Sequence, residues 1–176
     1  MNGRAIGLSS WFPVFVLALG GVGCACASPS REERSAFAVP PRAGFEPVSS
    51  MLEARCGSLD CHGQAGRNLR LYGVNGLRAA AGDLPGEDGG ETSAAEHDAN
   101  YEAIIALEPE ILDRVVREGG RAPERLTLVR KARNTEDHVG GEAIEPASDA
   151  DRCLTSWLAL SIDVAACESG AMVTRP

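Results

Sequence analysis

Two cysteines and a histidine lie close together in the segment 55–63, which reads RCGSLDCHG. A cysteine thiol can form a disulfide or add to a vinyl group, and a histidine directly after a cysteine can ligate iron. In the usual attachment motif for c-type haem, C-x-x-C-H, both thiols hold the porphyrin and the histidine binds its iron. Here four residues separate Cys56 from Cys61, and His62 follows. The motif is therefore C-x4-C-H.

Helix geometry determines what this spacing requires. Residues three apart lie about 60° apart around a helix axis, whereas residues five apart diverge by about 140°. Five residues of helix also exceed the roughly 7 Å limit for a disulfide. We therefore expect residues 57–60 to leave the helix whichever chemistry the two thiols perform. Gly57 suits this bulge, because glycine adopts unusual backbone angles without strain.

Two interpretations of the segment stay open. In the first, Cys56 and Cys61 hold one covalent haem c and His62 is the proximal iron ligand. In the second, the two cysteines form a disulfide and His62 is an ordinary polar residue. The second is serious because the folded part has an even number of cysteines, namely Cys56, Cys61, Cys153 and Cys167.

A bound iron needs a sixth ligand or keeps an open position. His138 is the first candidate, because Gly140 and Gly141 beside it would let the backbone approach a porphyrin closely. His97 is expected to be exposed in a polar helical turn. Met51 lies on the attachment side of the iron, and Met172 in the tail remains an alternative.

The composition indicates one domain of a modest size. The chain has 176 residues, of which 44% are hydrophobic and 24% charged. Its net charge of −8, without any run of Lys or Arg, argues against a nucleic-acid partner. No paired carboxylates, nucleophile–base pair or Gly-rich phosphate loop is visible, so the sequence does not predict an enzyme. An enzyme that uses an open haem position is a third alternative.

The N-terminal region is typical of an exported protein. Residues 1–27 predict a signal peptide whose apolar run is too short for a membrane span. Cys24 is the expected lipidation site, and cleavage after Ala27 is the alternative. Residues 28–47 predict a disordered tether, and residues 48–176 the folded domain. We therefore expect a periplasmic protein or an outer-membrane lipoprotein of a bacterium, touching the membrane only through its lipid anchor.

Apolar spacing and capping residues predict a small all-α domain with long irregular loops. Ser49 or Ser50 should cap a short helix that ends near Cys56. Ser93, Pro109 and Pro123 should open three further helices. The expected loops are 63–90 and 134–147, and a last helix should run from a Ser148 cap to Ile162.

The last helix carries two features of its own. Cys153 and Cys167 flank it, and in an oxidising compartment we expect them to pair and tie the C-terminal tail to the helix. Trp157 is expected in the core, although it could also pack against a porphyrin.

The chain also resembles a group of exported bacterial cytochrome c-like proteins, over about residues 51–167. In that group a Cys-His-Gly haem box precedes a Lys-loop-His-Gly-Gly segment and a final helix that ends in Trp-Leu. The resemblance implies a cytochrome c-like fold, haem bound by Cys56, Cys61 and His62, and His138 as the second ligand. The segments that carry it are MLEARCGSLDCHG, NLRLYG, NYEAIIALEPEIL, RLTLVRKARNTEDHVGG and CLTSWL.

Two functions follow as hypotheses. The first is an exported single-haem electron carrier serving a redox partner protein that the sequence does not identify. The second is a haem-free, disulfide-stapled envelope lipoprotein with a binding or structural role.

Overall fold

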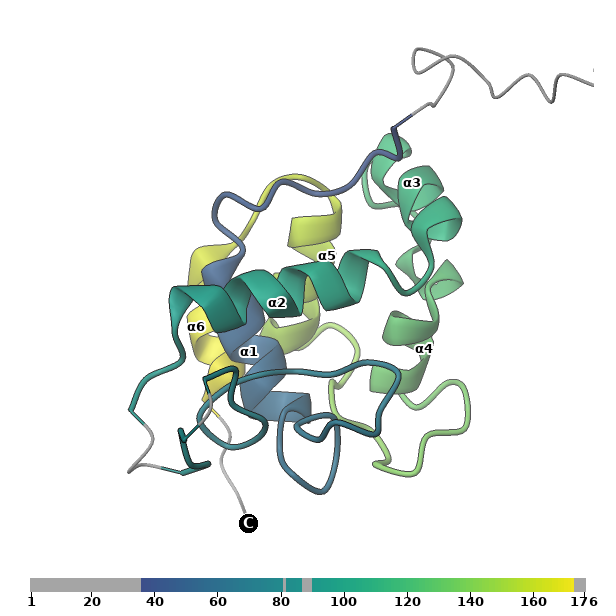
Figure 1. Ribbon diagram of the computed structural model, residues 1–176. Helices are drawn as coiled ribbons and strands as arrows, with labels where there is room; N and C mark the ends of the chain where they lie inside the picture. The colour runs from purple at the N-terminus through teal and green to yellow at the C-terminus, as the bar shows by residue number, and fades with distance from the viewer. Residues whose placement is uncertain (1–35, 81, 87–89, 173–176) are drawn as a thin grey trace, which may run out of the picture. The chain divides into compact units, whose positions relative to one another are not determined.

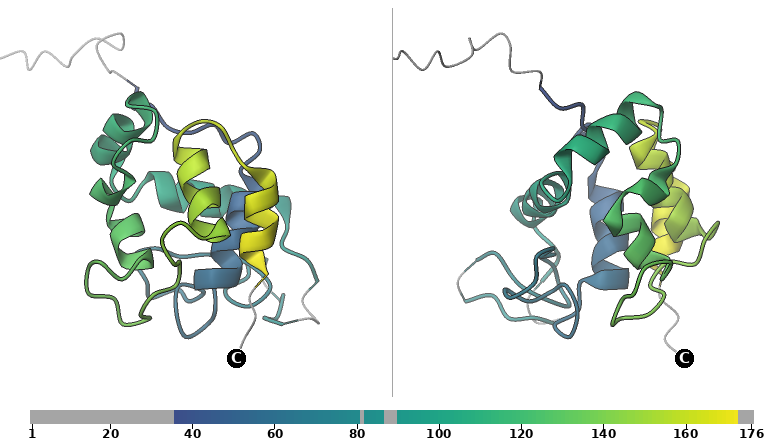
Figure 2. Two further views of the ribbon diagram at one scale, coloured as in Figure 1. Left: turned by 180° about the vertical axis from the view of Figure 1, so that it is seen from behind. Right: turned by 90° about the vertical axis from the view of Figure 1, so that its right-hand side faces the viewer.

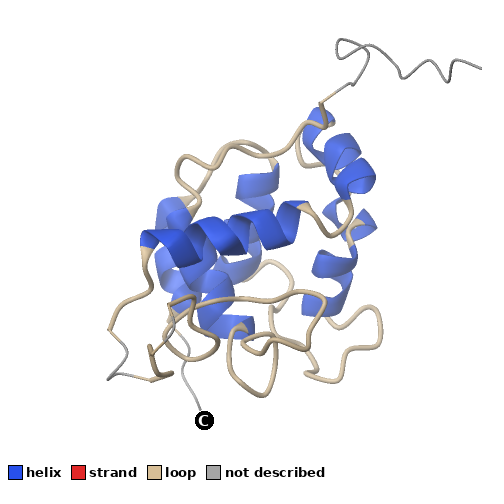
Figure 3. Ribbon diagram, in the orientation of Figure 1, coloured by secondary structure: helices blue, strands red, loops and turns tan. Residues whose placement is uncertain are grey.

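The computed structural model describes residues 36–80, 82–86 and 90–172, which form one compact unit from Ala36 onward. These residues contain no strand, only an isolated bridge between Tyr72 and Leu77, so the predicted all-α class is confirmed (Figures 1 and 3). The helices are α1 (Glu46–Cys56), α2 (Ala94–Ile105), α3 (Pro109–Arg117), the 3-10 turn η2 (Pro123–Arg125), α4 (Thr127–Ala132), α5 (Asp149–Leu158) and α6 (Val164–Ala171).

Helix α1 lies at the centre of the unit and packs against α2, α5 and α6. The right-hand view of Figure 2 shows α5 and α6 side by side on one side of α1, with α2 on the other. An aromatic cluster joins these helices, because the Phe45 ring lies 5.0 Å from Trp157 and 5.4 Å from Tyr101 between ring centres. Trp157 is thus a core residue, as its position in an apolar stripe predicts.

Local capping signals place three helix starts where the sequence predicts them. Ser93 and Glu96 form a reciprocal capping box at the start of α2. Pro109 occupies the first turn of α3, where its missing N–H costs nothing. The Ser148 hydroxyl accepts from the Asp151 amide and caps α5.

The folded domain begins earlier than the predicted start at residue 48. Helix α1 already begins at Glu46 without a serine cap, and the Phe45 side chain is only 2% exposed. The Tyr101 hydroxyl donates to the Pro40 carbonyl, and the Ala38 amide donates to Asp113. Residues 36–47 therefore pack on the domain, and the predicted tether boundary is wrong. The predicted signal peptide, Cys24 and residues 28–35 lie outside the described residues.

The C-terminal part also differs from the prediction. The predicted last helix ends earlier than Ile162, because α5 stops at Leu158 and Leu160 adopts a left-handed φ of 62°. A further helix, α6, was not predicted. Helix α6 follows, and Gly170 approaches α5 so closely that a Cβ atom there would lie 2.7 Å from the Ala150 Cα. The predicted disulfide between Cys153 and Cys167 is present, but it joins the two helices rather than flanking one.

The start of α4 is a smaller difference. Pro123 opens only the 3-10 turn η2, and α4 itself begins at Thr127. Arg130 and Lys131 lie in the last turn of α4, where positive side chains interact favourably with the helix dipole.

Buried acids order the long segment between α1 and α2. The Glu53 carboxylate, on α1, accepts from the Val74 amide and the Thr92 hydroxyl. Glu96 accepts from the Arg78 guanidinium at 2.8 Å, and both side chains are almost fully buried. These contacts pin a glycine-rich segment that has no helix of its own. None of the helices in the described part of the chain is long and apolar enough to cross a membrane.

Candidate functional site

The C-x4-C-H segment leaves the helix as its spacing predicts. Helix α1 ends at Cys56, and the Gly57 amide closes it by donating to the Glu53 carbonyl. A tight turn follows, in which the amides of Cys61 and Gly63 both donate to the Ser58 carbonyl. The His62 amide donates back to the carbonyl of Cys56. The two surplus residues are therefore absorbed in this turn, and His62 is held against the end of α1.

Three glycine backbones meet beneath this turn. A Cβ atom on Gly63 would lie 2.0 Å from the carbonyl oxygen of Gly57 and 2.7 Å from the Cα of Gly76. A Cβ atom on Gly76 would lie equally close, 2.0 Å from the same oxygen. No side chain fits there, so glycine is required for this close approach.

Cys56 and Cys61 are free thiols. The structure therefore has no disulfide between Cys56 and Cys61, contrary to the second interpretation of the segment. Cys56 is buried and Cys61 is half-buried. Burial raises the pKa of the Cys56 thiol to about 12, with a further rise from the neighbouring Cys61 and a partial opposing effect of Arg55.

His62 is oriented by a backbone contact. Its Nδ1 lies 3.0 Å from the carbonyl oxygen of Leu69. A carbonyl can only accept, so the hydrogen of the neutral imidazole is on Nδ1 and the lone pair is on Nε2. Metal-ligating histidines commonly use this arrangement, in which a backbone carbonyl fixes the tautomer of the ligand.

His138 repeats this arrangement on the loop between α4 and α5. Its Nδ1 lies 3.0 Å from the carbonyl oxygen of Gly141, which again leaves a lone pair on Nε2. The loop returns to the domain because the amides of Ala143 and Ile144 both donate to the Ala132 carbonyl. The histidine is thus carried by a loop whose later part is tied back to the end of α4.

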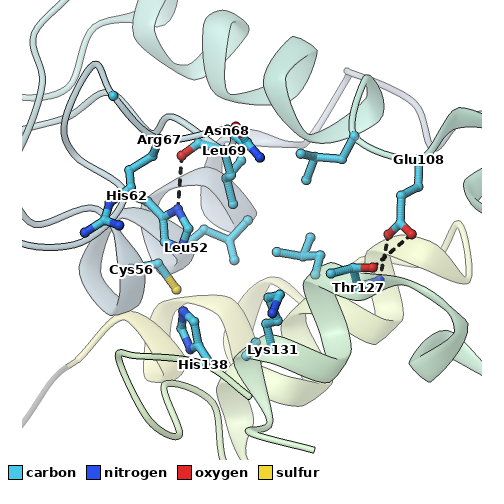
Figure 4. A pocket seen from close by; sticks show the side chains of 14 residues that line it. Leu52, Cys56, His62, Arg67, Asn68, Leu69, Glu108, Thr127, Lys131 and His138 are labelled. Atoms are coloured by element: carbon cyan, nitrogen blue, oxygen red, sulfur yellow. Dashed lines mark hydrogen bonds between the residues drawn. The ribbon is translucent and has the colours of Figure 1, made fainter. Parts of the chain in front are cut away.

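The two imidazoles lie opposite each other across a cavity (Figure 4). Their ring centres are 6.0 Å apart and their planes differ by 21°. Two imidazoles that share one metal from opposite sides place their ring centres about 6 Å apart, since each metal–nitrogen bond is about 2 Å long and each ligating nitrogen lies roughly 1 Å from its ring centre. The spacing of His62 and His138 matches that requirement.

The cavity has a volume of about 540 Å³, within the range of cofactor sites. Helices α1 and α4 and the segments 66–69 and 107–108 form its walls. Cys56 lines it, and the apolar side chains of the lining are four leucines and Ala132. The lining residues are Leu52, Cys56, His62, Gly66, Arg67, Asn68, Leu69, Leu107, Glu108, Thr127, Leu128, Lys131, Ala132 and His138.

The other candidate ligands lie elsewhere. Met51 is buried in the core, and Met172 is 71% exposed after the end of α6. His97 is half-buried rather than exposed, because its Nδ1 contacts the Ser49 hydroxyl at 2.9 Å. It borders a second, separate cavity of about 340 Å³. Of the residues weighed for the distal position, only His138 faces His62.

Two charged residues of the cavity wall were not predicted. Arg67 donates to the carbonyls of Asp60 and Cys61 and so braces the turn that carries the thiols. The Glu108 carboxylate accepts from both the amide and the hydroxyl of Thr127, at 2.6 and 2.9 Å (Figure 4). Neither contact has a local sequence signal. Arg67 bonds backbone carbonyls of the preceding turn, which any sequence would offer, and Glu108 bonds Thr127, which the fold brings beside it.

The donor set fits a haem better than a bare metal ion. Among the described residues, no group of three or more His, Cys, Asp or Glu side chains is placed to hold a metal ion. The pair of His62 and His138 supplies two ligands, and four further ligands would have to come from a bound group. A porphyrin supplies four nitrogens in one plane, and the cavity would accommodate it beside the Cys56 thiol; Cys61, five residues further on, does not line the cavity.

A comparison of the chain with protein-family models, with curated proteins and with solved structures finds no match. The function therefore has to be argued from the site itself.

Proposed function

We propose that the protein is an exported, single-haem c-type cytochrome-like electron carrier. In this proposal Cys56 and Cys61 attach the haem, His62 is the proximal iron ligand and His138 is the distal ligand. One observation carries the proposal: the imidazoles of His62 and His138, each with Nδ1 held by a backbone carbonyl, have ring centres 6.0 Å apart beside the unpaired Cys56 thiol.

The residues of this chain perform distinct tasks. The carbonyls of Leu69 and Gly141 hold the two imidazoles in the ligating tautomer. The apolar wall around Leu52, Leu107 and Leu128 excludes water, which sets the dielectric around the iron and therefore its reduction potential. A bound haem would supply a reversible one-electron couple.

Two protein ligands favour electron transfer over catalysis. Substrate or oxygen chemistry at iron needs an open coordination position, and His138 fills it in this proposal. Two histidines also favour a lower reduction potential than a histidine–methionine pair. The chemistry of the site does not identify the redox partner protein.

The location of the protein is also a proposal. The disulfide between Cys153 and Cys167 suits an oxidising compartment such as the periplasm. Attachment to haem would explain why Cys56 and Cys61 do not form a disulfide in such a compartment. Lipidation at Cys24, or cleavage after Ala27, would then decide between an outer-membrane lipoprotein and a released periplasmic protein.

One observation also supports the alternative function, that of a haem-free envelope lipoprotein. A haem-free, disulfide-stapled envelope lipoprotein also needs the bond between Cys153 and Cys167. It does not account for the cavity or for the matching tautomers of His62 and His138.

Expression with a haem-attachment system separates the two functions. We expect denaturing mass measurement to give the mass of the processed chain plus one haem, and the visible spectrum to show a low-spin Soret band. Loss of the adduct in the Cys56→Ala, Cys61→Ala double variant, with retention in the Cys153→Ser, Cys167→Ser double variant, supports attachment at the first pair. An unmodified mass without a Soret band contradicts the proposal.

A further inference from the structure

The loop that carries His138 is attached to a single helix. Its first two amides, those of Asn134 and Thr135, donate to carbonyls of α4. Its tip projects into solvent, where the Val139 side chain is fully exposed. In the described part of the chain, the hydrogen bonds and ion pairs of residues 136–142 stay within the loop or go to α4. The position of the distal histidine therefore depends on how this segment is tied to α4.

Glu136 makes that tie through its side chain. Its two carboxylate oxygens accept from Arg130 at 2.7 Å and from Lys131 at 2.9 Å, both in the last turn of α4. Lys131 also donates to the Asp137 carbonyl at 2.8 Å, directly before His138. The two residues that precede the histidine are thus both bound to α4.

Arg130 is itself fixed at the other end of α4. Its guanidinium donates to the carbonyls of Glu124 and Arg125, at 3.0 and 2.6 Å, and to the Thr127 hydroxyl at 2.9 Å. That hydroxyl in turn donates to the Glu108 carboxylate at the start of α3. A carboxylate that binds Arg130 is therefore held against an ordered part of the cavity wall.

The tie is exposed to solvent, although it acts on a residue of the cavity. Figure 4 shows Lys131 and His138 on the same side of the cavity, opposite His62. The side chains of Arg130, Glu136 and Lys131 are 33%, 37% and 40% exposed. Ion pairs with this exposure contribute little to overall stability and are screened by salt. They can nevertheless shift the position of a loop that has no other side-chain anchor.

We propose that Glu136 is a positioning residue for the distal iron ligand, which it holds in the cavity by tying the loop of His138 to Arg130 and Lys131. This inference rests on the proposed function. The distal position is then reversibly closed: the histidine leaves the iron and returns as the loop moves. A small anion such as cyanide binds the iron while the histidine is away.

The test is the rate at which cyanide binds the loaded ferric protein. Glu136→Gln keeps the size of the side chain but removes its charge. We expect cyanide to bind about three- to tenfold faster than in the wild type, because a loop held less firmly leaves the iron more often. The ferric spectrum should gain a high-spin component. The urea midpoint should stay that of the wild type, which a merely structural role of Glu136 would not predict.

Glu142→Gln is the matched control. Glu142 lies in the same loop and is exposed, and its carboxylate makes no hydrogen bond or ion pair with any described residue. The substitution makes the same change of net charge near the iron without breaking a tie to α4. Its cyanide rate and its spectrum should therefore equal those of the wild type.

Ionic strength tests the electrostatic nature of the tie. Raising it from about 0.01 M to about 1 M shortens the screening length from about 30 Å to about 3 Å. The wild-type and Glu142→Gln rates should rise toward the rate of Glu136→Gln, which should itself change little. In the haem-free protein, exchange of the Gly141 amide, which donates to the His138 carbonyl, should be faster in Glu136→Gln than in Glu142→Gln.

The outcomes separate the two proposals. A protein that carries no covalent haem contradicts the proposed function, and the role of Glu136 at the iron with it. A loaded, low-spin protein in which Glu136→Gln and Glu142→Gln bind cyanide at the same rate contradicts only the inference. A faster rate in Glu136→Gln that comes with a large fall of the urea midpoint also contradicts it, because the residue would then stabilise the fold as a whole.

Discussion

The Nδ1 atoms of His62 and His138 each contact a backbone carbonyl at 3.0 Å, one at Leu69 and the other at Gly141. One histidine follows α1 and the other follows α4, so nothing local relates them. The fold nevertheless gives both the same tautomer and turns them toward one cavity, with their ring centres 6.0 Å apart. This arrangement is the observation on which the proposed role of the two histidines as a pair of iron ligands rests.

Removal of the distal histidine is the first prediction. His138→Ala should keep the covalent haem, because Cys56, Cys61 and His62 are unchanged, but it should open one coordination position. We expect the ferric spectrum to change from low-spin to high-spin and added cyanide to bind at least about tenfold more readily. His97→Ala is the control and should leave the spectrum unchanged, because His97 borders a different cavity. A low-spin spectrum in His138→Ala would show that another residue is the distal ligand.

The close approach of glycines under the attachment turn gives the second prediction. Gly63→Ala forces a Cβ atom to within 2.0 Å of the Gly57 carbonyl oxygen, so the turn must move. We expect a loss of at least about 2 kcal/mol in the free energy of unfolding and a lower yield of covalent haem. Urea unfolding and mass measurement report the two effects.

Gly66→Ala is the matched control for that substitution. Gly66 lies three residues further along and has no atom within 4 Å of an added Cβ. Its unfolding free energy should change by no more than about 0.5 kcal/mol. Equal effects of the two substitutions would contradict the packing argument.

Unequal thiol reactivity in the haem-free protein is the third prediction. Cys56 is 8% exposed and burial raises its pKa to about 12, whereas Cys61 is half-buried. At pH 8 only about one Cys56 thiol in ten thousand is ionised, and the thiolate is the reactive form. Iodoacetamide should therefore modify Cys61 at least about a hundredfold faster.

Peptide mass mapping over time measures both rates in one sample. In Cys61→Ser the fast phase should disappear, and in Cys56→Ser it should remain. Equal rates at the two thiols would mean that the end of α1 opens readily to solvent.

Local signals were enough to predict much of the fold. Ser93 and Ser148 accept from amides in the first turns of α2 and α5, and such caps depend only on residues three apart. The turn after Cys56 follows from helix geometry alone. Helix α6 could not be predicted, because it consists mainly of small residues and is held by Gly170 against Ala150 and by the disulfide.

The site was predictable only in part, because only some of its residues belong to one local motif. Cys56, Cys61 and His62 lie within one short motif, so their spacing reveals them. His138 was suggested by the two glycines that follow it and by a resemblance, but no local pattern predicts that it faces His62. Glu108 and Arg67 line the cavity without any sequence signal. Glu108 is held there by Thr127, and Arg67 by the Asp60 carbonyl, and both contacts exist only in the folded chain.

The buried ion pair between Glu96 and Arg78 gives the last prediction, on acid stability. Burial alone would raise the pKa of the Glu96 carboxyl, but hydrogen bonds from Arg78, Ser93 and Ala79 lower it from 4.5 to about 2. A carboxyl whose folded pKa lies below its unfolded pKa stabilises the fold above the unfolded value. That contribution is lost as pH falls from about 4.5 to about 2.

The shift of roughly two and a half pKa units corresponds to about 3 kcal/mol. The wild type should therefore lose about 3 kcal/mol more than Glu96→Gln between pH 6 and pH 2, as measured by urea unfolding over a pH series. Glu110→Gln changes an exposed glutamate and should run parallel to the wild type over the whole range. Curves for wild type and Glu96→Gln that stay parallel would mean that Glu96 is not ionised in the fold. The Arg78 side chain would then hold the segment before α2 through its contacts with the Gly90 and Glu91 carbonyls rather than through the ion pair.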